Sequence, residues 1–365
     1  GFCCIGVTGV SSADLIKMRG VDNAKEYYRS QVSAIELVRR IAIDVDIDYQ
    51  AFGAAEVEVA HTPTAFRRLQ QEQELLSGTL GIESQIVGAD ESRERYYDSP
   101  EQFGAMVIRP AFGLHPLRYC KGLANASARR GARLHDRSEV LEWGKTDDGL
   151  HNLVTAGGSL KASRVVFATN GFMPEQLNRT FHARTLPVVS AIVVTRPLSE
   201  EEKAAQAWRT EHPSINSRRI LNYYRLLPDN RFLFGGRGHT KGHTSGERQT
   251  YDEIAGTMHR MLPAWANIEI EYRWHGLICY TRRLSPSIGQ LDEDPSVYFG
   301  FGYHGNGVNT ATWAGKQLAD WIGKGRAPKL PVIVMGLGGK FRPARLRLKY
   351  LQLGIRLSTL LDRRS

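Results

Sequence analysis

A glycine-rich turn near residue 300 is the segment best suited to close contact with a flat ligand. A short apolar strand, residues 297–300, leads into Gly302, Gly305 and Gly307, and a helical pattern then continues to Ile322. Glycines let the backbone approach a ligand, and a helix N-terminus adds about half a positive charge. The pattern indicates a site for a ligand that carries negative charge. A glycine-rich turn without any ligand fits the same residues.

A second candidate segment covers residues 163–171 and reads SRVVFATNG. Its apolar centre is typical of a short strand in a parallel sheet that is covered on both faces. Ligands collect at the carboxyl ends of parallel strands, so the turn after this strand would lie at a binding edge. A buried strand and turn without a ligand is the other interpretation.

The cysteines and histidines do not form a metal-binding pattern. Cys3, Cys4, Cys120 and Cys279 lack metal-ligand spacing, and we expect them to be reduced, as in a cytoplasmic protein. His239 and His243 are four residues apart, but the glycines around them favour a loop over a ligand-bearing helix. We therefore predict no metal site.

The charge of the chain is confined to its C-terminal tail. The net charge is +10, and residues 324–365 contain eleven Lys or Arg and a single acid, so the preceding 323 residues carry 37 bases and 37 acids. This balance argues against a nucleic-acid-binding protein. Leucines at helical spacing among these bases predict an amphipathic tail helix, and packing on the body of the protein is its simpler placement. Weak contact with an anionic membrane surface is the alternative. No apolar run approaches the ~20 residues that cross a bilayer.

The remaining patterns predict two interleaved domains. Helices are expected at residues 21–44, 64–80 and 117–130, and strands at residues 49–61 and 133–141. Parallel-sheet signals occur near residues 104–190 and 276–325, whereas antiparallel signals occupy residues 45–103 and 188–275. The fold class is therefore mixed α/β, with a Rossmann-like domain interleaved with an antiparallel-sheet domain.

Taken together, VVFATNGFMPE and FGFGYHGNGVNTATWAGKQLADWI resemble segments of the D-amino-acid-oxidase superfamily. RPAFGLHPLRYCKGLANASARRGARLHDRSEV, YYRLLPDNRFLFGGRG and WHGLICYTRRLSPSIGQL extend the resemblance over residues 1–325. The resemblance implies an FAD-dependent enzyme that oxidises the C–N bond of an amine or amino acid by hydride transfer to flavin, with gamma-glutamylputrescine-like substrates among the candidates. A non-catalytic remnant or interaction module that binds little FAD is the alternative.

The resemblance also implies roles for individual residues. Those expected to contact FAD are Gly1 and Phe2 beside the isoalloxazine, Val140 at the adenine, Ala168, Thr169 and Gly171 along the dinucleotide, and Gly302, His304, Gly305, Gly307 and Val308 at the pyrimidine end. Those expected to face the substrate are His115, Tyr224, Arg237 and Trp274.

Each substrate-facing residue has a structural alternative. Arg237 could hold a carboxylate by a two-pronged contact or could form a surface ion pair. His115 could be a hydrogen-bonded structural histidine. Tyr223 and Tyr224 alternate in direction, so at least one belongs to the core. Cys279 lies near the position where some relatives attach flavin covalently, but its spacing argues against that role.

The chain departs from the family at its start. Family members open with a strand, a G-x-G-x-x-G turn and a helix that binds the pyrophosphate, whereas GFCCIG resembles the loop that follows this unit. The chain is therefore expected to be a fragment that binds FAD poorly by itself. The expected division is a flavin-proximal loop and helix (1–44), two substrate-domain parts (45–103, 188–275), two FAD-binding parts (104–187, 276–325) and a basic tail (326–365).

Overall fold

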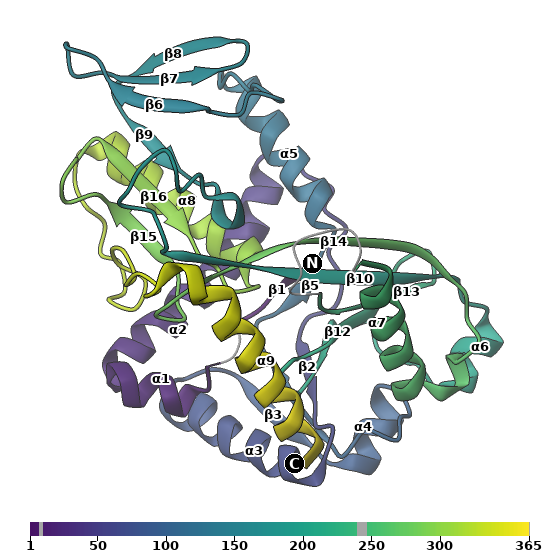
Figure 1. The fold of residues 1–365 in the computed structure, drawn as a ribbon. Coiled ribbons are helices and arrows are strands. Elements are labelled where there is room, and N and C mark those ends of the chain that lie inside the picture. The colour runs from purple at the N-terminus through teal and green to yellow at the C-terminus, as the bar shows by residue number, and fades with distance from the viewer. Residues whose placement is uncertain (7–9, 239–246, 365) are drawn as a thin grey trace.

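The structure, a computed structural model, describes residues 1–6, 10–238 and 247–364 (Figure 1). The helices are α1 (Ser12–Arg19), α2 (Val21–Asp44), α3 (Pro63–Glu74), α4 (Ala89–Arg95), α5 (Pro116–Arg129), α6 (Glu200–Ala205), α7 (Glu247–Met261), α8 (Gly307–Lys324) and α9 (Arg347–Arg364). The strands are β1 (Phe2–Cys3), β2 (Glu56–Val59), β3 (Ser84–Val87), β4 (Ala105–Ile108), β5 (Phe112–Gly113), β6 (Glu142–Lys145), β7 (His151–Thr155), β8 (Gly158–Ala162), β9 (Val165–Phe167), β10 (Thr185–Pro197), β11 (Ser214–Asn216), β12 (Tyr223–Leu226), β13 (Arg231–Arg237), β14 (Ile270–Thr281), β15 (Ser287–Gln290) and β16 (Val297–Phe301). Shorter turns are η1 (Leu75–Thr79), η2 (Asn170–Phe172), η4 (Pro263–Trp265) and η5 (Ala344–Leu346).

The largest sheet has the strand order β14-β10-β13-β12-β11-β2-β4-β3. Its neighbouring strands are antiparallel, except that β2 and β11 run parallel. Helix α7 covers one face, where alternating strand residues and the helix bury an aromatic core. Members of this core include Val193, Phe232, Phe234, Met258 and Trp265. The opposite face of β10, β12, β13 and β14 carries more polar residues and is described below.

A smaller sheet, in the order β15-β16-β9, unites the two segments singled out in the sequence. β9 and β16 are parallel, with Val165 opposite Val297 and Phe167 opposite Phe299, and α8 follows β16 directly. This sheet and α8 lie beside the hairpin strands β6, β7 and β8 (Figure 1). The carboxyl end of β9 and the turn before α8 therefore lie at the same edge of one sheet.

Several expected elements form as predicted. Helix α2 spans residues 21–44, with Ala24, Tyr27, Ile35 and Val38 buried at helical spacing. The hairpin expected around residues 147–149 joins β6 and β7. The helix expected at residues 64–80 forms as α3, which begins at Pro63 behind the N-cap Thr62 and continues as the π-helical turn η1.

Two strand predictions and the placement of a third strand require correction. The strand expected at residues 49–61 is limited to β2, because Gly53 turns with positive φ and Phe52 pairs with Gly113. Residues 133–141 form no strand, since exposed side chains there leave no apolar face to bury. The segment starting at residue 104 was assigned to the FAD-binding domain. β4 instead lies between β2 and β3 in the large sheet, where Val107 joins the aromatic core.

β9 also differs from the expected strand covered on both faces. Val166 at its centre is 44% exposed. Among the described strands, β9 pairs only with β16, so its second edge has no neighbour. The apolar side chains of β9 are therefore buried on one face of this strand.

The tail forms helix α9, which crosses in front of the rest of the molecule in Figure 1. Arg347 anchors its start through an ion pair of 2.6 Å with Glu175. Tyr350 and Leu353, which were expected to pack on the body, are about half exposed. Among the described residues, no helix is long and apolar enough to cross a membrane.

The aromatic core generates a simple prediction. Met258 is completely buried between α7 and the large sheet. Met258→Ala should lower the free energy of unfolding by about 2–5 kcal/mol, because it removes buried apolar surface and leaves a cavity. Met18 is 51% exposed, so Met18→Ala should change that free energy by at most about 0.5 kcal/mol. Urea denaturation measures both, and equal losses would contradict the assignment of this core.

Candidate functional site

Strand β12 directs its two tyrosines to opposite faces of the large sheet. Tyr224 was expected to face the substrate, but it is completely buried in the aromatic core, where its hydroxyl lies 2.5 Å from that of Tyr97. Its ring also stacks on Phe234 at 5.6 Å. Tyr224 therefore has a structural position, and the side chain on the other face is Tyr223.

Tyr223 lies flat on the neighbouring strand β13. A Cβ atom at Gly235 would be 2.1 Å from the Tyr223 ring, so the glycine makes room for that ring. The Tyr223 hydroxyl is 2.7 Å from Ser190 Oγ, and the ring of Phe2 meets it edge-on at 6.2 Å. The N-terminal loop and the large sheet therefore meet at Tyr223. Phe2 is also the residue that was expected beside the isoalloxazine.

Arg237 and Trp274 share this face, as the strand register shows. Arg237 is opposite Ser190, and Trp274 is opposite Ile192, two residues further along β10. Trp274 is 44% exposed. Nε and Nη1 of Arg237 are buried and have no hydrogen-bond partner within the described residues. We call this surface, made by Ser190, Tyr223, Arg225, Arg237 and Trp274, the site face.

His115 lies beside the site face rather than on it. It is the N-cap of α5, where its Nδ1 accepts a hydrogen bond from the backbone N–H of Arg118 at 3.4 Å. Burial and the nearby positive charge of Arg118 lower the pKa of His115. A cavity of about 290 Å³ opens next to it, with Phe52 and Arg225 in its lining. His115 thus has the structural, hydrogen-bonded position that was considered as an alternative. It also lines a cavity that could admit a ligand.

Arg225 and Phe52 are residues of this region that the sequence prediction missed. The available signal was alternation, because Arg225 follows Tyr223 by two residues and must share its face of the sheet. Phe52 gave no comparable signal. Its ring fills the space over Gly113, where a Cβ would lie 1.7 Å away, and this contact joins segments 61 residues apart.

The turn between β16 and α8 has the close packing expected of a ligand-binding loop. Gly302 has a φ of 77°, and a Cβ at this position would be 2.3 Å from Thr281 Cγ2. Its N–H donates to the Asn170 side chain at 2.9 Å, which ties the turn to the end of β9. The two sequence motifs are therefore joined by a direct hydrogen bond.

His304, in the same turn, is almost completely buried and adopts a φ of 54°. Its Nε2 accepts a hydrogen bond from the Thr281 N–H at 3.2 Å, whereas Nδ1 has no partner among the described residues. Burial and the nearby charge of Arg283 lower the pKa of His304 to about 3, so the ring is neutral at physiological pH. An unpartnered neutral ring nitrogen fits the polar pyrimidine edge of a flavin.

A buried amide network fixes the N-terminal loop against α8. Asn306 precedes α8, and its Nδ2 donates to the Cys4 carbonyl at 2.9 Å and to Gln31 Oε1 at 3.0 Å. Asn309 donates to the same Cys4 carbonyl at 3.1 Å. Because the Asn306 side chain is used in this way, it makes no capping bond to the first turn of α8. The N–H groups around Gly307 and Val308 therefore remain suited to an anionic ligand.

Glu56 is buried next to this network. It projects from β2 beside the Cys4 thiol and is 5% exposed. Burial raises the pKa of Glu56 to about 7, and burial with neighbouring carboxylates raises that of Glu58 to about 8. The loop expected to border the flavin is thus backed by carboxyl groups that titrate near neutral pH.

The residues expected along the rest of the dinucleotide differ in exposure. Ala168 and Thr169 are exposed after β9, Val140 is half-buried at the end of an exposed segment, and Gly171 is buried against Leu277. Gly305 is exposed at the turn before α8. The residues present fit the flavin end of FAD through the glycine turn and α8. The described chain places no second glycine turn and helix N-terminus at β9 for a pyrophosphate.

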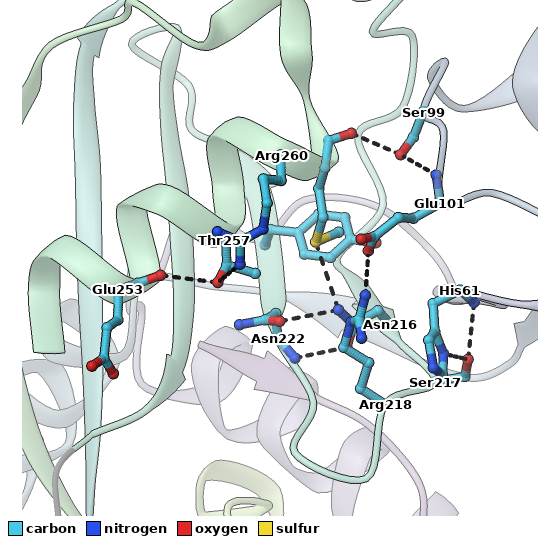
Figure 2. Close-up of polar contacts among 12 residues, drawn as sticks. His61, Ser99, Glu101, Asn216, Ser217, Arg218, Asn222, Glu253, Thr257 and Arg260 are labelled. Atoms are coloured by element: carbon cyan, nitrogen blue, oxygen red, sulfur yellow. Dashed lines mark hydrogen bonds and ion pairs between the residues drawn. The ribbon is translucent and has the colours of Figure 1, made fainter. Parts of the chain in front are cut away.

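A separate polar cluster supports the large sheet from its α7 side (Figure 2). Asn216 and Asn222 exchange hydrogen bonds of 3.1 and 2.8 Å across the β11–β12 turn. Nδ2 of Asn222 also donates to the Gly235 carbonyl at 3.3 Å, while Arg218 pairs with Glu101 at 2.7 Å. These contacts fix the strand on which Tyr223 rests, which is a structural role.

The part of the chain that the structure describes contains no set of side chains arranged to bind a metal ion. No group of three or more His, Cys, Asp or Glu residues there could hold a metal ion. His239 and His243 lie outside the described residues. Cys279 is buried, as is Cys3, and burial raises the pKa of both thiols to about 12.

Comparison with known proteins identifies the family. The sequence pattern of the FAD dependent oxidoreductases, DAO, matches residues 4–321 and thus most of the chain. The chain belongs to the DAO family of FAD-dependent oxidoreductases. This result confirms the resemblance seen in the motifs, the mixed α/β fold and the expected cofactor.

Individual DAO relatives differ in how much they share with this chain. The probable oxidoreductase OrdL of Haemophilus influenzae is 32% identical over 213 residues, which are 57% of this chain and 47% of that protein. Gamma-glutamylputrescine oxidoreductase of Escherichia coli is 26% identical over 311 residues, 84% of this chain and 70% of that protein. Glycine oxidase from Geobacillus kaustophilus has a similar fold, with a TM-score of 0.74 at 18% identity, over 87% of this chain and 84% of that one. The match to OrdL therefore spans about half the length of that protein.

The hydrogen bond between the buried hydroxyls of Tyr97 and Tyr224 generates a prediction on stability. Tyr224→Phe should lower the free energy of unfolding by about 1–3 kcal/mol, because the Tyr97 hydroxyl then lacks its partner inside the core. The double variant Tyr97→Phe/Tyr224→Phe should recover much of this loss. Chemical denaturation of the three variants tests the coupling, and strictly additive losses would contradict it.

Glu56 generates a prediction on pH. The folded-state pKa is raised from 4.5 to about 7, so the stability contributed by neutral Glu56 is complete below pH 4.5 and is lost as the pH rises through about 7. Glu56→Gln should therefore be more stable than the parent chain at pH 8, by up to about 3 kcal/mol, and similar to it at pH 4. Glu58 remains and leaves a residual decline.

Urea unfolding across this pH range measures the effect. Exposed Glu94 provides the matched control, and Glu94→Gln should keep the pH dependence of the parent chain. An unchanged decline in Glu56→Gln would show that Glu56 is ionised without cost in the folded state.

Proposed function

We propose that this protein oxidises the C–N bond of a small amine or amino acid, with the substrate held on the site face and FAD as the electron acceptor. The observation that carries the proposal is the partly buried Arg237 on the same face as Tyr223 and Trp274, with Nε and Nη1 unpartnered among the described residues. Members of the DAO family use FAD. When bound, FAD supplies the acceptor for the hydride that leaves the carbon next to nitrogen.

The chain's own residues would bind and orient the substrate. Arg237 is only partly buried, and its guanidinium would hold a carboxylate by a paired contact. Trp274 presents a partly exposed apolar ring on this face, and Tyr223 contacts Phe2 of the N-terminal loop. Gly302, His304, Gly307 and Val308 would hold the flavin end of FAD. Orientation of this kind lowers the barrier without an acid–base dyad.

One relative is named as an oxidoreductase of gamma-glutamylputrescine, and another is named as an oxidase of glycine. Arg237 is compatible with any substrate that bears a carboxylate. We propose that the substrate is an amine or amino acid that bears a carboxylate. An activity assay with a panel of such compounds identifies which one is used.

The test begins with the purified protein and its flavin absorbance before and after addition of FAD. Oxygen uptake or dye reduction is then measured with a panel of amines and amino acids. Arg237→Met should raise the KM for carboxylate-bearing substrates by about 10- to 100-fold and change that for simple amines much less. Arg237→Lys should give an intermediate KM for carboxylates.

Two results would contradict the proposal. A protein that stays colourless when FAD is added would rule out this activity for the chain and would favour a non-catalytic role. Equal loss of activity with amines and amino acids in Arg237→Met would remove Arg237 from substrate binding. Arg95 is exposed and pairs with Glu91, so Arg95→Met is the control for general effects of removing an arginine.

A further inference from the structure

Arg225 is a buried cation with no hydrogen-bond or ion-pair partner among the described residues. Its side chain is on the site face, and the residue is only 5% exposed. Nε is buried and unpartnered, and the guanidinium forms no hydrogen bond or ion pair with any described residue. Its close contact is the ring of Phe52, whose centroid lies 4.1 Å from the guanidinium carbon. A positive charge removed from water normally requires an opposite charge or a set of hydrogen bonds.

The surroundings of Arg225 do not supply that opposite charge. Burial lowers the pKa of Arg225 to about 10, which still leaves the guanidinium protonated at neutral pH. One acid, Asp229, lines the cavity, and Asp48 pairs with the lining residue Arg118, but both carboxylates are bound to arginines other than Arg225. Asp48 accepts a hydrogen bond of 2.6 Å from Arg118, and Asp229 pairs with Arg231 at 3.1 Å.

The cavity beside Arg225 has room for an anionic group. Its volume is about 290 Å³, and Gln50, Phe52, His115 and Arg118 contribute to its lining. Phe52 closes one side with an apolar ring, while Gln50 and Arg118 offer N–H donors. A planar anion could therefore bind the guanidinium by paired hydrogen bonds at this position.

The location of Arg225 connects the cavity with the proposed substrate site. Arg225 and Tyr223 are two residues apart on β12, which corresponds to roughly 7 Å along the strand. Arg225 is opposite Leu233, so Arg237 lies four residues further along β13, or roughly 13 Å away. Tyr223 is opposite Gly235, midway between the two arginines. An elongated small molecule could span this distance along one face.

We propose that the Arg225 cavity binds a carboxylate, and that the substrate carries this carboxylate at the end remote from the C–N bond that is oxidised. The second part rests on the proposed function, whereas the first depends only on the cavity. Phosphate is the competing anion, and its larger charge and tetrahedral shape distinguish it experimentally from a planar carboxylate.

Calorimetric titration of the full chain with glutarate tests the first part and needs no flavin. Glutarate should bind with millimolar or better affinity, and Arg225→Met should weaken it by at least about tenfold. Arg225→Lys should bind more tightly than Arg225→Met, because it keeps the charge and loses only the paired geometry. Arg95→Met should bind as the parent chain does.

Folding and specificity controls complete the experiment. Arg225→Met should unfold at the same temperature as the parent chain or higher, since it removes an unpaired buried charge. Unchanged glutarate binding in Arg225→Met, or no binding to the parent chain, would overturn the proposal. Inorganic phosphate that binds more tightly than glutarate and depends on Arg225 would overturn the carboxylate assignment.

The second part is tested by steady-state kinetics with matched amines that possess or lack a remote carboxylate. Arg225→Met should raise the KM of the carboxylate-bearing amine by at least about tenfold and leave that of its partner unchanged. Equal KM changes for both would overturn the substrate assignment while glutarate binding stands. Absence of any turnover, with Arg225-dependent glutarate binding intact, would identify a failure of the proposed function alone.

Discussion

The buried amide of Asn306 connects the parts of the chain on which the candidate site depends. It holds the carbonyl of Cys4 and the side chain of Gln31, so the N-terminal loop, α2 and α8 meet at one residue. β1 extends from the same loop and pairs with β5, which places Phe2 against Tyr223 of the large sheet. Loss of these hydrogen bonds would separate the loop from α8. It would also leave polar groups unpaired inside the protein, which is costly.

The site face depends on a second constraint, the alternation of side chains along β-strands. Tyr224 stabilises the core because its neighbours Tyr97 and Phe234 are buried on the α7 side. The same alternation directs Tyr223 and Arg225 to the opposite side. A one-residue change of register would exchange core and site residues, so the aromatic core fixes the site as firmly as any contact within it.

The sequence was informative where a pattern is local. The apolar residues of the 24-residue helix α2 recur at helical spacing, and the motifs around residues 165 and 300 predicted two strand ends, which lie together in the structure. The sequence was less informative where contacts between distant segments determine the position of a residue or strand. The face of Tyr224 depends on Tyr97, and the assignment of β4 to the large sheet depends on β2 and β3. Phe52 and Arg225 meet through a contact between residues 173 positions apart, which no local period reveals. The net charge did not predict the site either. Its excess comes from the basic tail, whereas Arg225 is a single buried cation in the body of the protein.

One edge of β9 has no partner among the described strands, and this has a structural consequence. A strand with free N–H and C=O groups along one side is a template onto which another strand can add. Val166, which is 44% exposed, adds apolar surface on the face of the sheet next to this edge. A sheet with an open edge gains hydrogen bonds when a further strand joins it. Any strand that pairs with this edge, from the same chain or from another, would extend the sheet and satisfy these groups.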